Sequence, residues 1–159
     1  MTSFPQPPGG RFDGPVHRYA VRAYFEDTDL SGVVYHANYL RWFERARSDL
    51  LRLLGIDQRA AHEAGEGAYA VSEITLRYRA PARLDDVVLI ETIAEELGAA
   101  SCRLFQRACR LDGSGGEIRT LLADARLRVG FVGPDGRPRR QPAAWRAAFT
   151  TITPLPEPQ

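Results

Sequence analysis

The sequence predicts an α+β domain in which one long central helix packs against a curved antiparallel sheet. An amphipathic helical pattern covers residues 37–54, a short strand pattern precedes it at 17–25, and four longer alternating segments follow it. Strand patterns in succession indicate an antiparallel meander, so we expect a sheet of five strands. A chain of 159 residues suffices for one such domain with a substantial core, but not for two with a linker.

Three parts of the chain differ in composition. Residues 1–15 are rich in Pro and Gly and too poor in apolar side chains to be buried, so we expect a disordered arm there. The predicted domain covers residues 16–135 and ends in a turn that contains Gly133 and Gly136. Residues 136–159 are expected to form a tail with a short helix near its start.

The first strand and the long helix have distinct apolar faces. In the strand predicted at 17–25, one face would carry Tyr19, Val21, Ala23 and Phe25. The helix at 37–54 has Asn38 as its expected N-cap and Gly55 as its C-terminal stop. Its apolar stripe would consist of Leu40, Phe43, Ala46, Leu50 and Leu54, and its polar side of Arg41, Glu44, Arg45, Arg47 and Arg52.

After a second short helical piece around 58–64, the period changes from helical to alternating. The four alternating segments, each bounded by turn residues, are 69–79, 86–97, 101–111 and 117–132. In the last one, the apolar side would carry Leu121, Ala123, Ala125, Leu127, Val129 and Phe131. Because one helix cannot cover both faces and the edges of such a sheet, we predict at least a dimer.

Composition and charge exclude several classes of protein. With 44% hydrophobic and 26% charged residues, the chain is typical of a soluble globular protein, and its formal net charge of +1 gives no field that would attract nucleic acid. No apolar run approaches the roughly 20 residues of a membrane span, and we expect a cytoplasmic protein. Cys102 and Cys109 are expected to be buried thiols on opposite faces of one strand, neither bonded to each other nor part of a metal site.

The segment from residue 24 to residue 40 carries most of the chemical information. It contains the acids Asp27 and Asp29, a Ser31–Gly32 turn and His36, directly before the long helix. Backbone N–H groups at a helix start lack intrahelical partners, and the positive end of the dipole favours negative charge there. The sequence therefore places a carboxylate close to a site that can stabilise an oxyanion.

Each of these residues also has an ordinary structural interpretation. Aspartate commonly caps turns, and we assign that role to Asp27, whose carboxylate is expected to hydrogen-bond the turn. His36 taken alone would be one more histidine near a helix start. His17 and His62 lack such a context and are expected at the surface, and Glu44 is expected to pair with a neighbour on the helix surface.

Four stretches of the sequence together resemble the hotdog-fold acyl-CoA thioesterases. They are Tyr-Phe-Glu-Asp-Thr-Asp at 24–29, Gly-Val-Val-Tyr-His-Ala-Asn-Tyr at 32–39, Phe-Glu-Arg-Ala-Arg at 43–47 and Tyr-Arg-Ala-Pro-Ala-Arg-Leu-Asp-Asp at 78–86. The branch that they resemble most is that of the Tol-Pal-associated thioesterase and, more distantly, 4-hydroxybenzoyl-CoA thioesterase. The resemblance extends over about residues 17–132 and implies a hotdog fold, with a long central helix wrapped by the curved sheet.

The resemblance also implies an assembly and a set of site residues. Subunits of this family join edge to edge as a homodimer, often paired again as a homotetramer, and share active sites that hydrolyse an acyl-CoA substrate without a cofactor or a metal. Asp29 matches the catalytic carboxylate, and His36 matches the histidine that marks the Tol-Pal-associated branch. Ser101 matches a serine at the start of the fourth strand, but the basic tract before that serine is missing here. Other residues would then contact the phosphates of CoA: Arg103, Arg126, Arg128 or the run 137–140.

Hydrolysis of a thioester needs a base or nucleophile and fixed donors for the carbonyl oxygen. Asp29 either adds to the carbonyl carbon, giving a mixed anhydride, or activates water, and the sequence leaves both open. His36 would orient water, protonate the leaving sulfur or bind substrate. The Gly32 turn lets the backbone approach the substrate, and the expected substrate-binding backbone consists of Gly32, Val33, Val34, Tyr35 and Ala37.

Two other functions remain open from the sequence. One is a dehydratase or hydratase of acyl thioesters, which would centre on a histidine and an acid on the central helix, whereas Asp29 precedes the helix. The other is a non-catalytic protein of the same fold that binds acyl thioesters or acts as a scaffold. Turnover of acyl-CoA that disappears in an Asp29→Asn variant would argue against this second alternative.

Overall fold

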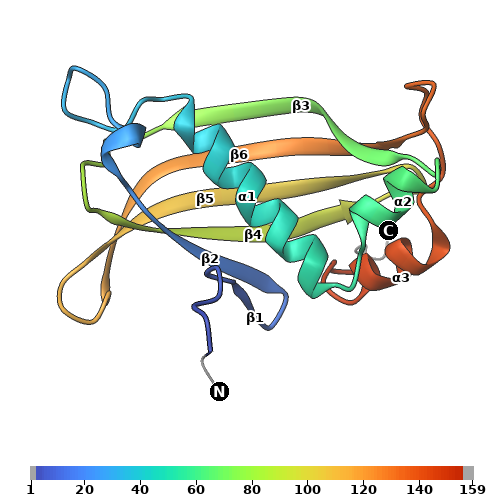
Figure 1. Ribbon diagram of the computed structural model, residues 1–159, viewed down its shortest axis with the longest axis horizontal. Helices are drawn as coiled ribbons and strands as arrows, with labels where there is room; N and C mark the ends of the chain where they lie inside the picture. The colour runs from blue at the N-terminus through green and yellow to red at the C-terminus, as the bar shows by residue number, and fades with distance from the viewer. Residues whose placement is uncertain (1–2, 156–159) are drawn as a thin grey trace.

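The computed structural model describes residues 3–155 and consists of an antiparallel sheet with one long helix running diagonally across one face (Figure 1). No helix within this part of the chain is long and apolar enough to cross a membrane. In chain order the elements are β1 (Arg11–Asp13), β2 (Val16–Arg22), the 3₁₀ turn η1 (Phe25–Asp27), α1 (Asn38–Leu53), α2 (Gln58–Glu63), β3 (Ala68–Tyr78), β4 (Val87–Leu97), β5 (Ser101–Asp112), β6 (Ile118–Val132) and α3 (Ala143–Thr150).

The sheet has six strands in the order β1-β2-β4-β5-β6-β3 rather than the five expected. The predicted meander is correct for β4, β5 and β6, but β3 pairs with β6 and not with β4. The edge of β4 is already occupied by β2, with Ala20 opposite Leu89. The connection at 79–86 therefore crosses from one edge of the sheet to its interior, and β3 forms the far edge.

The sixth strand, β1, lies within the segment that we expected to be a disordered arm, and that prediction is wrong for residues 11–13. Phe12 pairs with His17 in an antiparallel ladder, and the ring of Phe12 packs edge-on against the His17 ring. Just before β1, the backbone N–H of Gly10 donates to the carboxylate of Asp49 on α1 at 3.0 Å. Groups far along the chain order this segment, and the composition of residues 1–15 alone gives no sign of these contacts.

The helix α1 buries a face slightly rotated from the predicted stripe. Phe43, Ala46 and Leu50 are buried as expected, but Leu40 is 41% exposed, and Tyr39 and Trp42 take its place in the core. Arg47, expected on the polar side, is buried. Ala37 is the N-cap in place of Asn38, whose side-chain amide instead donates to the backbone carbonyl of Asp27 at 2.8 Å. Gly55, with a φ of 75°, follows the helix as predicted.

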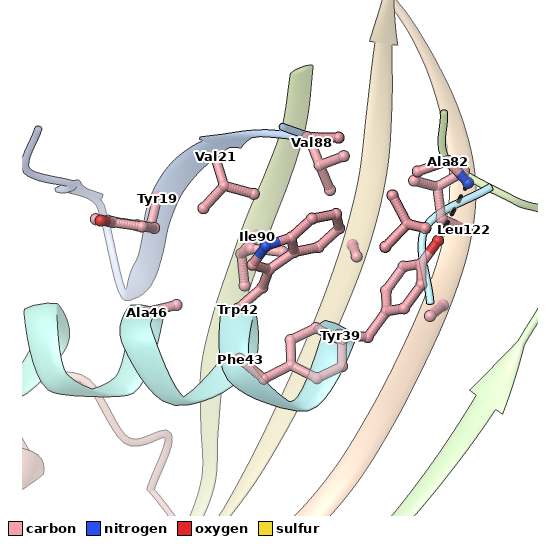
Figure 2. Close-up of a cluster of buried hydrophobic side chains, with 14 of the residues drawn as sticks. Tyr19, Val21, Tyr39, Trp42, Phe43, Ala46, Ala82, Val88, Ile90 and Leu122 are labelled. Carbon is pink, nitrogen blue, oxygen red and sulfur yellow. Dashed lines mark hydrogen bonds between the residues drawn. The ribbon is translucent and has the colours of Figure 1, made fainter. Parts of the chain in front are cut away.

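The core between α1 and the sheet centres on large aromatic and branched side chains. Trp42 and Phe43 are 2% and 0% exposed, and Figure 2 shows the Trp42 ring beside Ile90 of β4. Burying each such side chain contributes about 1.5–3 kcal/mol. A second cluster lies under the C-terminal half of α1, where Phe149 of α3 closes the end of the sheet. These contacts fix the direction of α1 and thereby the position of the loop before it.

Local irregularities explain the remaining differences between the predicted and the observed burial of strand residues. The register of β5 and β6 shifts after Ala108, so Leu122 is buried at the shift while Leu121 is 39% exposed. Phe25, expected on the buried face of the first strand, is 82% exposed because the strand ends at Arg22 and a 3₁₀ turn follows.

Cys102 and Cys109 are buried and free, as predicted, and burial raises the pKa of the Cys102 thiol to about 12.

Candidate active site

The loop that joins β2 to α1 is held in place by backbone hydrogen bonds to the 82–86 segment. Ala23 N–H donates to the Asp86 carbonyl at 2.9 Å, and Val34 N–H donates to the Ala82 carbonyl at 2.8 Å. The hydroxyl of Tyr39, in the first turn of α1, accepts from the N–H of Ala82 at 3.2 Å (Figure 2). Two segments about fifty residues apart in the sequence thus form one rigid rim at the start of the helix.

Asp27 has the turn-forming role that the sequence predicts. Its carboxylate accepts from the N–H of Tyr24 at 2.8 Å, and its backbone carbonyl accepts from the Tyr35 N–H at 2.8 Å. The side chain of Asn38 donates to the same carbonyl. With its carboxylate engaged in this way, Asp27 holds the loop against the start of α1.

The carboxylate of Asp29 lies at the surface in the turn that follows. It accepts hydrogen bonds from the backbone N–H of Ser31 at 2.8 Å and from the Ser31 hydroxyl. These two hydrogen bonds, with a smaller contribution from the charge of His36, lower the pKa of Asp29. Gly32 has a φ of 78°, a conformation that closes this turn and that side chains other than glycine rarely adopt. Asp29 is therefore ionised at neutral pH and accessible from solvent.

His36 lies in a group of aromatic side chains next to this turn. Its ring centroid is 4.4 Å from that of Tyr35 and 6.2 Å from that of Tyr78. The hydroxyl of Tyr78 donates to the backbone carbonyl of His36 at 2.7 Å, and partial burial raises the pKa of Tyr78, so this donor stays protonated. The sequence did not indicate this role for Tyr78, although the residue stands at a strand end just before Pro81.

Only part of the expected oxyanion site has free donors. The N–H groups of Val34 and Tyr35 already donate to Ala82 and Asp27, so the expectation that they point at a substrate oxygen is wrong. The N–H groups of His36 and Ala37 donate to no other group within residues 3–155. They precede the first turn of α1, where the helix dipole adds a positive potential.

Ser101 does not join the other predicted site residues within one chain. The loop that carries Asp29 also contains the predicted residues Gly32, Val33, Val34, Tyr35 and Ala37. Ser101, in contrast, begins β5 at the opposite end of the sheet. β5 has twelve residues and so spans roughly 36 Å. The hydroxyl of Ser101 accepts from the guanidinium of Arg128 at 3.4 Å, which gives this end of the sheet one basic group beside the serine.

The chain is similar in sequence to known thioesterases. A family model described as the thioesterase superfamily matches residues 31–117. The chain is 39% identical over 133 residues to the acyl-CoA thioester hydrolase YbgC of Escherichia coli, covering 83% of this chain and 94% of that protein. It is 42% identical over 92 residues to the acyl-CoA thioesterase YbgC of Haemophilus influenzae, covering 58% and 68% of the two chains.

Solved structures show the same fold. A probable thioesterase from Bartonella henselae is 33% identical with a TM-score of 0.67, covering 80% of this chain and 99% of that one. A mutant 4-hydroxybenzoyl-CoA thioesterase in complex with 4-hydroxybenzoyl-CoA is 24% identical with a TM-score of 0.75, covering 84% and 98%. The predicted hotdog fold is thereby confirmed, and the chain belongs to the thioesterase superfamily.

Proposed function

We propose that this protein hydrolyses acyl-CoA thioesters to a free acid and coenzyme A. The observation that carries the proposal is the exposed, ionised carboxylate of Asp29 beside the N–H groups of His36 and Ala37, which donate to no group within residues 3–155. A reacting thioester needs these two features on the two sides of its carbonyl group. The 39% identity to an acyl-CoA thioester hydrolase supports the same chemistry.

In this mechanism the carbonyl oxygen of the thioester accepts from the His36 and Ala37 N–H groups. An oxygen of Asp29 adds to the carbonyl carbon, the carbon–sulfur bond breaks, and water then hydrolyses the mixed anhydride. In the other version, Asp29 takes a proton from water, the resulting hydroxide adds to the carbon, and the thiolate of CoA leaves with that proton. The imidazole of His36, exposed beside the loop, would protonate the sulfur or orient the water.

The assembly that we propose is a homodimer joined through the β3 edges, and paired again as a homotetramer. β3 is an edge strand, and beside it Leu40 and Val71 are 41% and 42% exposed, which leaves apolar surface for a second copy to cover. A two-fold axis between antiparallel β3 strands would bring the Ala68 end of one strand to the Tyr78 end of the other. The end of the sheet that carries Ser101 would then approach Asp29 of the neighbouring copy, giving a shared site.

The dehydratase or hydratase alternative gains no support from the geometry. A dehydratase of this fold would need a histidine on the central helix, and α1 contains none between Asn38 and Leu53. The acid Glu44 on that helix is bound to Arg47.

The compartment that we propose is the cytoplasm, where the free thiols of Cys102 and Cys109 would stay reduced.

The experiment that tests the function is thiol release from short, long and aromatic acyl-CoAs by the native protein and by Asp29→Asn. The matched control is Asp135→Asn, because the carboxylate of Asp135 accepts from the N–H of Arg137 at 3.0 Å, just as that of Asp29 accepts from the N–H of Ser31 at 2.8 Å. We expect turnover to fall about 10²-fold or more in Asp29→Asn and to stay unchanged in the control.

Equal turnover by the native protein and Asp29→Asn would show that Asp29 is only a turn residue. Binding of acyl-CoA without any turnover by the native protein would favour the non-catalytic alternative. The acyl group that reacts fastest would show whether aliphatic or aryl thioesters are the substrates.

A further inference from the structure

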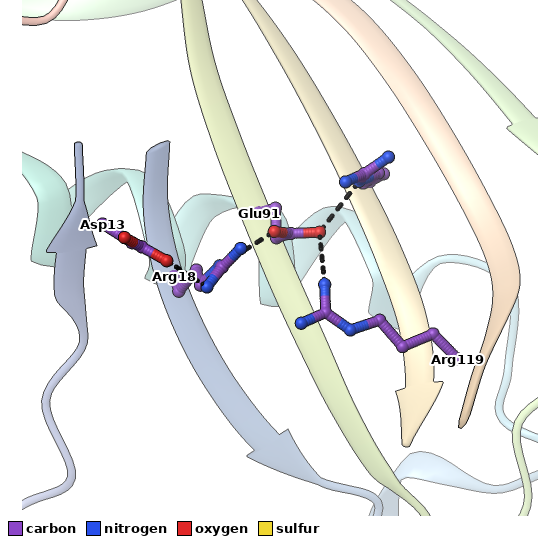
Figure 3. Close-up of polar contacts among 5 residues, drawn as sticks. Asp13, Arg18, Glu91 and Arg119 are labelled. Atoms are coloured by element: carbon purple, nitrogen blue, oxygen red, sulfur yellow. Dashed lines mark hydrogen bonds and ion pairs between the residues drawn. The ribbon is translucent and has the colours of Figure 1, made fainter. Parts of the chain in front are cut away.

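A groove lined by arginines lies at the β1–β2 edge of the sheet, on the face away from α1. Arg11 of β1, Arg18 of β2 and Arg119 of β6 line it, and no acidic side chain is among the lining residues. Tyr19 and Ile90 point into the core under α1, so their neighbours Arg18 and Glu91 point to the other face (Figure 3). The groove is therefore separate from the loop that carries Asp29.

A buried carboxylate holds the guanidinium groups at this groove. Glu91, only 2% exposed, accepts from Arg18 at 2.9 Å through one oxygen and from Arg107 at 2.9 Å through the other. Arg119 approaches the second oxygen at 3.4 Å (Figure 3). Burial opposes ionisation of Glu91, but the hydrogen bonds and charges of its arginines outweigh it and lower the pKa. Glu91 is thus a fixed anion that orients its three partners.

The cluster keeps an excess of positive charge after these pairings. Three arginines line the groove, Arg11, Arg18 and Arg119, and the ion pairs of Arg18 and Arg119 reach two acids, Asp13 and Glu91. Arg11 forms no ion pair within residues 3–155, and it stands directly opposite Arg18 in the β1–β2 register. Like charges opposite each other on neighbouring strands are destabilising. A bound anion would remove this repulsion.

The walls of the groove leave room for a ligand close to the backbone. Gly9 and Gly10 form one side, and Gly115 and Gly116 in the β5–β6 hairpin form the other, so these four residues place no side chain of their own in the groove. The Asp49 carboxylate lies against Gly10 and the Glu117 side chain against Gly115, and neither acid lines the groove. Gly116 has a φ of 67°, which excludes most other residues from that position. The donors of Arg11 and the second amino group of Arg119 are available to an incoming group.

We propose that this groove binds the phosphate group of a phosphorylated small molecule. Guanidinium groups in a fixed orientation match phosphate oxygens with paired hydrogen bonds, and several of them around one site favour a group with two negative charges. The groove lies at the opposite edge of the sheet from β3, so an assembly through β3 leaves it accessible. The proposal does not depend on thioester hydrolysis.

The test is titration calorimetry of the full chain with inorganic pyrophosphate at low ionic strength, where exposed charges are least screened. We expect saturable binding that weakens about tenfold or more in the double variant Arg11→Gln/Arg119→Gln. Arg59→Gln is the matched control, since Arg59 is an exposed arginine on α2 paired with Glu63 at 3.0 Å, and it should bind as the native protein does. Asp29→Asn should also bind pyrophosphate normally, which separates this site from the proposed hydrolytic one.

Unchanged binding in the double variant, or no saturable binding by the native protein, would overturn the proposal. Arg11→Gln alone provides a second variant that cannot disturb Glu91, because Arg11 makes no ion pair with that carboxylate. Two further probes identify the source of the phosphate group once binding is seen. Adenosine 3′,5′-bisphosphate represents a free nucleotide and phosphatidylglycerol vesicles represent a lipid headgroup, and loss of either interaction in the double variant supports the groove as its site.

Discussion

The two ends of α1 use charged and polar side chains in opposite ways. Before its first turn, Asp29 and His36 are exposed, and the loop that carries them is held mainly by backbone hydrogen bonds. In its second half, Arg47 and Asp49 point into the protein and bind partners on the sheet and just before β1. The candidate catalytic groups are thus carried by a scaffold that does not depend on them.

The buried polar groups, by contrast, are part of the scaffold. Arg47 donates to the side-chain oxygen of Gln106 at 2.8 Å, and Gln106 donates in turn to Thr92 at 2.9 Å and to the Phe43 carbonyl at 3.1 Å. Gln106 and Thr92 are fully buried. Substitutions in this network should therefore change stability first, whereas substitutions around Asp29 should change activity first.

The largest effect on stability is expected from Arg47→Ala. It leaves the side-chain oxygen of fully buried Gln106 without its donor, and a buried polar group without a partner is costly. We expect the free energy of unfolding in urea to fall by about 2–3 kcal/mol. Arg45→Ala is the control, because Arg45 lies two residues earlier on the exposed side of the same helix. It should change the free energy of unfolding by less than about 0.5 kcal/mol. Equal effects of the two substitutions would show that the buried network has no special weight.

The next effect is a dependence of stability on pH that originates at His17, which we had expected at the surface. Its ring is fully buried, with Nε2 2.7 Å from the Asp49 carboxylate and Nδ1 without a partner in the described residues. Burial lowers the pKa of His17 below 6.5 and outweighs the opposing effects of Asp49. The unfolded chain therefore takes up a proton first as the pH falls below 6.5, and the folded state loses stability.

This loss should reach at most about 1.4 kcal/mol per pH unit, and it should end once His17 is protonated in the folded state as well. Unfolding in urea between pH 7.5 and 5 measures it. The variant His17→Phe, which keeps a ring at the site, should lose this part of the pH dependence, while His62→Phe at the surface should keep it. A native protein whose stability is flat from pH 7.5 to 5 would contradict the burial argument.

The prediction of the fold succeeded where the signal was local. The alternation that predicts β4, β5 and β6 lies within each strand, and their bounds agree with the structure to within one or two residues. The position of β3 could not be predicted, because it depends on which sheet edge β2 leaves free. β1 was not predicted because its position also depends on a distant residue, Asp49, whose carboxylate binds the N–H of Gly10 just before β1 from 39 residues away.

The candidate site was predictable in part for a similar reason. The resemblance that identified Asp29 and His36 rests on a continuous stretch of sequence, and the structure keeps that stretch together in one loop. Which backbone N–H groups remain free depends on the Ala82 carbonyl, which no pattern in the loop itself reveals. The contact of Tyr78 with His36 joins residues 42 positions apart and was missed because it has no periodic signature.

The smallest expected effect is that of Tyr78→Phe, and it tests whether the exposed loop needs the support of this side chain. The Tyr78 hydroxyl fixes the carbonyl of His36, and that carbonyl belongs to the peptide group that supplies the Ala37 N–H. Loss of this partly exposed hydrogen bond should raise the activation free energy by about 1 kcal/mol, which corresponds to roughly a fivefold loss of kcat. The melting temperature should fall by no more than a few degrees. Tyr19→Phe is the control, because Tyr19 lies in the core beneath α1, away from the loop. A fall in melting temperature without a fall in kcat would assign Tyr78 to the scaffold, and would mean that the other hydrogen bonds of the loop position the donors beside Asp29.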